Sequence, residues 1–174
     1  MATLKHCPDC QRAFGFFRWR YQCPKCLRTV CSDCLRRIPA TEWLPFDVFD
    51  APRNLYLDSY DGFCRACWDI LILPNFRQYE NAIASESFIT CWPRTYKGRI
   101  PVRSDSRGEP ISTTWQRNRD DADKMLRVHA AYLQFNAVIE IERMTEVQSE
   151  GGTSKKGTHR YTAWKASGVP CRID

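Results

Sequence analysis

The sequence predicts an α+β protein in two parts: a small cysteine-rich module, then a domain with one helix on an antiparallel sheet. Three observations predict this class. Eight of the ten cysteines form four Cys-x-x-Cys pairs within the first 67 residues. One later segment has apolar residues at helical spacing, and segments on both sides of it alternate like strands. We therefore expect domains at 1–84 and 85–174.

The cysteine pairs are the strongest signal in the chain. They are Cys7/Cys10, Cys23/Cys26, Cys31/Cys34 and Cys64/Cys67. Two intervening residues let one tight turn point both sulfurs at a single ion, and two such turns complete a tetrahedral shell of four thiolates. Eight thiolates therefore predict two zinc ions. Because a closed shell leaves no position for water or substrate, both ions should be structural.

Disulfides and an iron–sulfur cluster are the alternatives to zinc. Residues 1–7 contain no apolar segment of a secretory signal, and disulfide-rich chains are usually small and secreted. Spacing alone does not choose the metal, so iron stays open. The longest uncharged apolar stretch, 70–74, is far shorter than the ~20 residues that cross a bilayer. We expect a soluble, intracellular (cytoplasmic) protein.

The N-terminal module is both basic and aromatic. Residues 1–37 hold eight lysines and arginines against two acidic residues, and 13–21 (AFGFFRWRY) interleaves rings with arginines. In so small a module we expect these rings to cover the metal sites, because few other apolar groups exist. The arginines either balance the charge of the thiolates or form an anion-binding face. The candidate partner-binding residues are Phe16, Phe17, Arg18, Trp19 and Arg20.

The spacing of the pairs resembles the FYVE-type zinc finger. That family has four cysteine pairs with the same four-residue gap between pairs two and three, and the closest match is CPKCLRTVCSDC at 23–34. The resemblance implies a cross-brace, treble-clef-like topology and a helix after the last pair, for which 68–84 is the candidate. It implies one zinc on Cys7, Cys10, Cys31 and Cys34, and the other on Cys23, Cys26, Cys64 and Cys67.

The residues that bind phosphatidylinositol 3-phosphate in that family are largely missing here. Its basic RRHHCR-like motif corresponds to 19–24 (WRYQCP), which retains only Arg20 and Cys23. The arginine of its late Arg-Val-Cys motif corresponds to Gly62. The cysteine ligands of the family are therefore present in this chain, whereas its lipid-binding residues are mostly absent. PHD and RING fingers share the cross-brace and stay analogies. The long acidic and aromatic insert at 36–63 is expected to pack onto the second domain.

In the C-terminal half we expect one helix among several strands. Strands are predicted at 87–92, 97–102, 137–144 and 159–167, the last extended by 169–173, with a turn at 104–110 and a flexible loop at 148–157. Within 137–144, Ala137, Ile139 and Ile141 should share one face. Asn118 or Asp120 can cap the helix. Its apolar face is predicted to hold Ala122, Met125, Leu126, His129, Tyr132 and Leu133.

The strand–helix–strand–strand order resembles a small bacterial βαββ family described as heavy-metal-binding-like and often oligomeric. The helix running into 136–139 (NAVI) and the strand containing 162–164 (TAW) carry this resemblance. It implies an exposed sheet or edge that pairs between subunits, and so a homo-oligomer.

We predict no catalytic residues. His129 lies on the apolar helix face, His159 has no evident partner, and no phosphate loop, nucleophile elbow or HExxH motif occurs. Cys91 and Cys171 are either free thiols or neighbours of each other. We expect a non-enzymatic zinc-binding adaptor that recognises a protein partner. The alternatives are peripheral binding to an anionic or phosphoinositide-bearing membrane, nucleic-acid binding, and an enzyme in the C-terminal domain.

Overall fold

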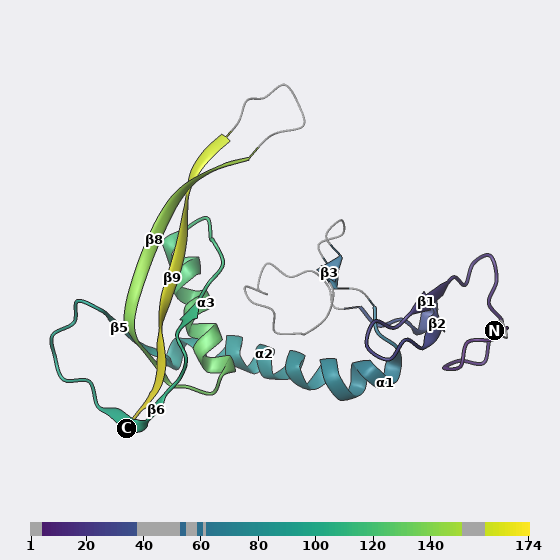
Figure 1. Cartoon of the computed structure of the whole chain (residues 1–174), viewed down its shortest axis with the longest axis horizontal. Helices are drawn as coiled ribbons and strands as arrows, with labels where there is room; N and C mark the ends of the chain where they lie inside the picture. The colour runs from purple at the N-terminus through teal and green to yellow at the C-terminus, as the bar shows by residue number, and fades with distance from the viewer. Residues whose placement is uncertain (1–4, 38–52, 55–58, 61, 151–158) are drawn as a thin grey trace. The chain divides into compact units, whose positions relative to one another are not determined.

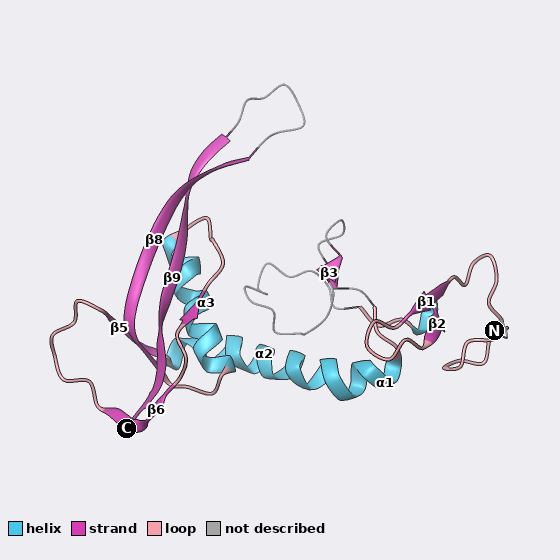
Figure 2. Ribbon diagram, viewed as in Figure 1, coloured by secondary structure: helices cyan, strands magenta, loops and turns pink. Residues whose placement is uncertain are grey.

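The computed structural model describes residues 5–37, 53–54, 59–60, 62–150 and 159–174. It divides into two compact units, Met1–Arg77 and Gln78–Asp174, which are described here one at a time. The protein is mixed α/β, and its helices and strands are shown in Figures 1 and 2. Most of the 36–63 insert and most of the loop expected at 148–157 lie outside the described residues.

Unit 1 is built from very short strands and turns. β1 (Arg20–Gln22) pairs antiparallel with β2 (Thr29–Cys31), and β3 (Arg53–Asn54) pairs with β4 (Ser59–Tyr60). A 3-10 turn, Ser32–Cys34, follows β2. The buried hydrophobic residues among its described part are Cys7, Cys23, Val30, Cys31, Phe63, Cys64 and Ile72. So small an apolar core does not hold a fold by itself, so the cysteines must contribute.

A helical run follows the last cysteine pair, as expected from the sequence. It consists of α1 (Arg65–Cys67), a π-helical turn (Trp68–Ile72) and α2 (Leu73–Ser85). Pro74 stands at the second position of α2, where it has no N–H to donate. The wider turn directly before it, Trp68–Ile72, leads into α2 without an interruption of the helical run.

Unit 2 is a five-stranded sheet with one helix packed against it. The strand order is β5-β8-β9-β6, and β7 pairs with β9 beside β6. The elements are β5 (Thr90–Pro93), β6 (Val102–Arg107), β7 (Ile111–Ser112), α3 (Arg119–Tyr132), β8 (Ala137–Glu150) and β9 (His159–Ile173). Helix α3 lies against β8 and β9 (Figure 1). Ala122, Leu126 and Ala130 of α3 form one core with apolar residues of the sheet.

The expectation of a fully antiparallel sheet is wrong at one edge. β5 pairs with β8 in parallel, with Thr90 opposite Ala137 and Cys91 opposite Val138. Parallel neighbours need a long crossover connection, and the chain between β5 and β8 supplies one that contains α3. The strand expected at 97–102 is also displaced, because β6 starts at Val102 and occupies much of the turn predicted at 104–110.

A β-bulge in β8 changes which side chains share a face. Pairing with β9 shifts register between Ile139 and Glu142, and Glu140 has a left-handed φ of 56°. Ile139 therefore packs with Ala137 and Cys171, whereas Ile141 packs in the core that contains α3. The prediction that Ala137, Ile139 and Ile141 lie together is wrong for Ile141, because one extra residue reverses the alternation.

Helix α3 follows its sequence signals closely. Asn118 caps it, since its Oδ1 accepts a hydrogen bond of 2.8 Å from the backbone N–H of Asp121. Ala122, Met125 and Leu126 are buried as predicted. Leu133, predicted on the same face, is 41% exposed because the helix ends at Tyr132.

Candidate metal centres

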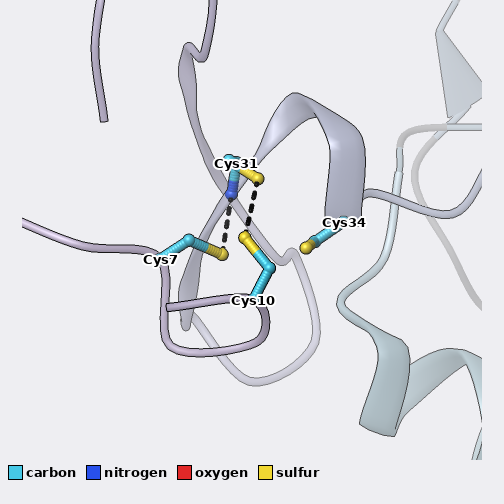
Figure 3. A group of neighbouring side chains, drawn as sticks. All are labelled: Cys7, Cys10, Cys31 and Cys34. Carbon is cyan, nitrogen blue, oxygen red and sulfur yellow. Dashed lines mark hydrogen bonds between the residues drawn. The ribbon is translucent and has the colours of Figure 1, made fainter. Parts of the chain in front are cut away.

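The structure gathers eight cysteines of unit 1 into two groups of four. Cys7, Cys10, Cys31 and Cys34 form one group, and Cys23, Cys26, Cys64 and Cys67 form the other. Within each group the four sulfurs lie within 4.8 Å of one another. The first pair therefore meets the third and the second meets the fourth. Figure 3 shows the first group, whose side chains converge on a common centre.

The first and second pairs lie on turns of the same design. In each, the N–H of the first cysteine donates to the carbonyl five residues on: Cys7 to Arg12 at 2.8 Å and Cys23 to Arg28 at 2.9 Å. The residue after the second cysteine closes the turn with a positive φ, 58° at Gln11 and 59° at Leu27. A repeated C-P-x-C-x-R sequence at 7–12 and 23–28 underlies the match. This repeat is the signal in the sequence that predicts two turns of one design.

The third and fourth pairs lie on helical turns instead. Cys31 ends β2 and Cys34 ends the 3-10 turn, while Cys64 precedes α1 and Cys67 closes it. Arg36 and Phe63 exchange two backbone hydrogen bonds of 2.9 and 2.8 Å, which hold the chain before Cys64 beside the third pair. Gly62 permits this approach, since a Cβ there would lie 2.0 Å from Cγ of Leu35.

The sulfur spacing suits a tetrahedral metal ion. Cys10 Sγ and Cys31 Sγ are 3.7 Å apart, and Cys26 Sγ and Cys64 Sγ are 3.6 Å apart. Zinc–sulfur bonds of about 2.3 Å place tetrahedral sulfurs about 3.8 Å from each other. A disulfide needs about 2.05 Å, and all of these cysteines are free thiols. Each group has the number, chemistry and spacing of ligands that a metal ion requires, which is compatible with zinc fingers.

The protonation of each group favours a cation at its centre. Burial alone would raise the pKa of Cys7 and Cys23, but backbone N–H groups that donate to their sulfurs lower each pKa to about 7. Burial raises the pKa of Cys34 and Cys67, and the neighbouring cysteine sulfurs raise it further. Four thiolates so close together are unfavourable without positive charge, and a divalent ion removes that conflict.

Basic side chains tie the cysteine turns to one another. Arg28 of the second turn contacts Asp9 of the first, with Nη1 and Oδ1 3.3 Å apart. Arg18 Nε contacts Asp33, between the cysteines of the third pair, at 3.1 Å. These ion pairs therefore link the second turn to the first, and the segment before β1 to the third pair.

The aromatic segment does not cover the metal sites, so that expectation is wrong. Phe16 and Phe17 are 86% and 89% exposed, and Trp19 is 66% exposed. Gly15 and Arg18 exchange backbone hydrogen bonds, which places both phenylalanines at the tip of a tight turn. The side chains of Val30 and Phe63, which directly precede Cys31 and Cys64, are fully buried instead. Because the turn between Gly15 and Arg18 is so short, the two phenylalanine rings at its tip cannot fold back onto buried apolar residues.

The remaining residues singled out from the sequence lie in unit 2. Burial lowers the pKa of His129 to about 4, which keeps its imidazole neutral near pH 7. His159 begins β9 at an exposed position. Cys91 and Cys171 are free thiols, the first half-buried and the second buried.

No family model, curated protein or solved structure matches this chain. Among the described residues, no helix combines the length and the apolar composition needed to span a bilayer.

Proposed function

We propose that this chain is a non-catalytic interaction protein whose N-terminal unit is a FYVE-like finger organised by two structural zinc ions. The observation that carries the proposal is the interleaved grouping of the four cysteine pairs into two sets of four sulfurs. Interleaving ties together turns that are distant in sequence, as in a cross-brace. With four thiolate ligands each, neither ion keeps an open position for chemistry.

Metal analysis of the purified full chain tests the zinc assignment. We expect two zinc ions per chain. Cys10→Ser and Cys26→Ser should each remove one ion, because they change different groups. Cys91→Ser is the matched control and should leave both, since Cys91 belongs to neither group. A zinc content of zero in freshly purified protein, or iron in its place, would overturn the proposal.

The partner-binding surface in this proposal is the turn that carries Phe16 and Phe17. Two adjacent exposed rings lose water contact favourably when a partner covers them, and their edge-to-face packing, with centroids 5.3 Å apart, holds them in one arrangement. Arg20 lies over the ring of Phe14 at 5.0 Å, so a positive charge borders the same surface. Aromatic residues, phenylalanine included, and arginine are enriched in the buried cores of protein interfaces.

A double variant tests this surface. Phe16→Ala with Phe17→Ala should abolish capture of the partner while leaving the zinc content at its normal value. Phe88→Ala is the control, because Phe88 is a phenylalanine of similar exposure, 79%, in unit 2. Affinity purification followed by quantitative mass spectrometry compares the three proteins. A partner set that is unchanged by the double variant contradicts the assignment of this surface.

A second candidate function is peripheral membrane binding through the same turn. The exposure of Phe16 and Phe17 at a tip bordered by Arg18 and Arg20 favours it, because apolar rings enter the bilayer interface while arginines meet anionic headgroups. Sedimentation with phosphatidylserine vesicles, with and without phosphatidylinositol 3-phosphate, tests it. Failure to sediment with either kind of vesicle removes this candidate and leaves the protein-partner proposal intact.

A further inference from the structure

A second candidate site lies within unit 2. It is an open pocket of about 660 Å³ between the segment 93–107 and β8. Its apolar floor includes Ile139, whose neighbours Ile100 and Val102 pack on the sheet face opposite the α3 core. The polar side chains around it are Arg94, Tyr96, Arg103, Ser104, Arg107 and Glu140.

The pocket forms where regular strand pairing fails on three sides. Register shifts occur between Cys91 and Pro93 against β8, between Ile139 and Glu142 against β9, and between Val102 and Arg107 against β9. Each shift lies next to residues that line the pocket. Glu140, the left-handed residue of the bulge in β8, projects into the same region. Bulges and unusual backbone angles often occur beside binding sites because they re-aim side chains.

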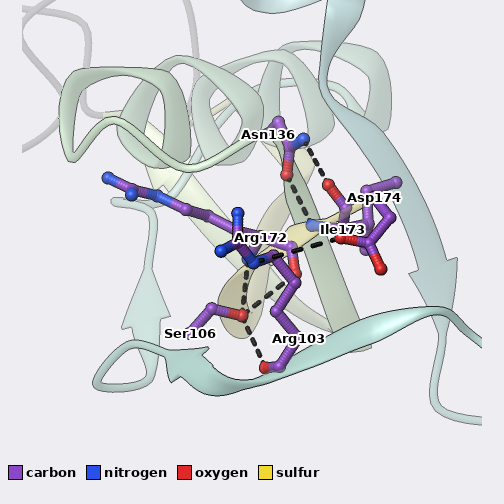
Figure 4. Close-up of polar contacts among 6 residues, drawn as sticks. All are labelled: Arg103, Ser106, Asn136, Arg172, Ile173 and Asp174. Carbon is purple, nitrogen blue, oxygen red and sulfur yellow. Dashed lines mark hydrogen bonds and ion pairs between the residues drawn. The ribbon is translucent and has the colours of Figure 1, made fainter.

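The segment that carries two of the arginines is fixed to β9 by a serine (Figure 4). Ser106 Oγ lies 2.7 Å from the carbonyl of Arg103 and accepts from the N–H of Arg172 at 3.2 Å. These contacts hold the backbone between Arg103 and Arg107 beside β9. The adjacent end of β9 is fixed separately by Asn136, which accepts from the N–H of Ile173 at 2.8 Å and donates to its carbonyl at 3.0 Å.

Three arginines line the pocket, and each has an acidic partner in an ion pair that is exposed to water. Arg94 contacts Glu142, Arg107 contacts Glu140 at 3.3 Å, and Arg103 lies 4.0 Å from Asp174. These side chains are all about half exposed or more, and such surface pairs contribute only about 0–1 kcal/mol. An incoming anion can therefore displace these carboxylates from the guanidinium groups at little cost in free energy.

We propose that this pocket binds a small phosphate monoester. Guanidinium groups pair with phosphate through two parallel hydrogen bonds, and three arginines from different backbone positions match three terminal oxygens better than the two of a carboxylate. The volume is in the range of small-molecule sites, so room remains for an organic group. Tyr96 lies beside that room, with its ring folded onto Gly98, where a Cβ would be 2.3 Å from the tyrosine Oη.

Titration of the zinc-loaded full chain with glycerol phosphate at constant ionic strength tests the proposal. Backbone and arginine Nε signals are followed by NMR. We expect saturable shifts at the pocket residues, and about tenfold weaker binding for Arg103→Gln and for Arg107→Gln, since each removes a charged hydrogen bond. Arg117→Gln is the matched control, because Arg117 is a similarly exposed arginine paired with Glu150 outside the pocket. It should bind as the unchanged protein does.

Three results of the titrations with soluble ligands would overturn the proposal. In the first, the NMR shifts do not saturate and are spread over many surface arginines, which indicates an unspecific effect of charge. Another is equal weakening by Arg117→Gln and the two pocket variants. The third is succinate binding as tightly as glycerol phosphate. A separate experiment uses vesicles that contain phosphatidic acid. If the protein binds these vesicles but shows no shifts with the soluble ester, the ligand is a lipid headgroup, and the proposal of a small phosphate monoester is wrong.

Discussion

Two residues of unit 1 adopt a backbone conformation that their side chains disfavour. Gln11 and Leu27 have φ of 58° and 59°, in the left-handed region where glycine is the usual residue. Both stand directly after the second cysteine of a turn, where the chain must reverse so that the carbonyl of the next residue, Arg12 or Arg28, accepts from the N–H of the first cysteine. The strain is therefore a local cost of presenting two sulfurs from one short turn.

Leu27→Gly should stabilise unit 1 by roughly 0.5–1 kcal/mol, because glycine removes most of the left-handed penalty but loses more entropy on folding. The leucine side chain is 66% exposed, so its removal uncovers little. Urea denaturation of the zinc-loaded protein measures the change. Leu27→Ala is the control and should give no gain, because alanine keeps the strained backbone. Equal stability of the two variants would show that the conformation of residue 27 is not the cause.

At the scale of an element, the bulge in β8 organises unit 2. It directs Ile139 to one face of the sheet and Ile141 to the other, so each face receives its own apolar cluster. Gly168 of β9 lies across from it, and a Cβ there would be 2.6 Å from Cγ1 of Val138 and 3.0 Å from the carbonyl of Ile139. The strands approach this closely only because position 168 has no side chain.

Gly168→Ala should therefore destabilise unit 2 by about 1–3 kcal/mol through overpacking. Combining it with Val138→Ala should cost less than the sum of the two single changes, because the smaller residue makes room for the new methyl group. Thermal unfolding followed by the near-ultraviolet signal of Trp164 and its neighbours measures all three proteins. Strict additivity would mean that the two positions do not compete for the same space.

At the scale of the whole molecule, the two units obtain stability in different ways. Unit 2 has a buried core that joins α3 to the sheet, whereas the described part of unit 1 buries few apolar side chains besides cysteines. Metal binding energy in such a small module acts as folding energy. We therefore expect the units to respond differently to removal of metal.

A strong zinc chelator should unfold unit 1 and leave unit 2 folded. Acidification should act the same way on unit 1, because protons compete with metal for the cysteine sulfurs. Cys7 and Cys23, whose pKa is lowered to about 7 by backbone N–H groups, become protonated as the pH falls below that value. Amide hydrogen exchange reports both units in one sample, with Val30 and Val138 as markers. Protection of Val30 that persists once metal analysis shows an empty protein would contradict this dependence.

The sequence by itself determined the features that depend on short stretches of chain. Two residues between cysteines fix the reach of their sulfurs, and Asn118 with the apolar positions after it fixes where α3 begins and which face it buries. The two left-handed turns also have a signal in the sequence, since C-P-x-C-x-R occurs twice. These signals are local, and local geometry follows from covalent structure and from hydrogen bonds within a few residues.

Tertiary structure alone decided what depends on distant pairing. The parallel register of β5 with β8, the bulge at Glu140 and the exposure of Phe16 and Phe17 result from which segments compete for the same core. Arg94, Arg103 and Arg107 are scattered in the sequence and share a pocket only because three register shifts occur at one end of the sheet. Register is set by the packing of both faces at once, and no single strand carries that information.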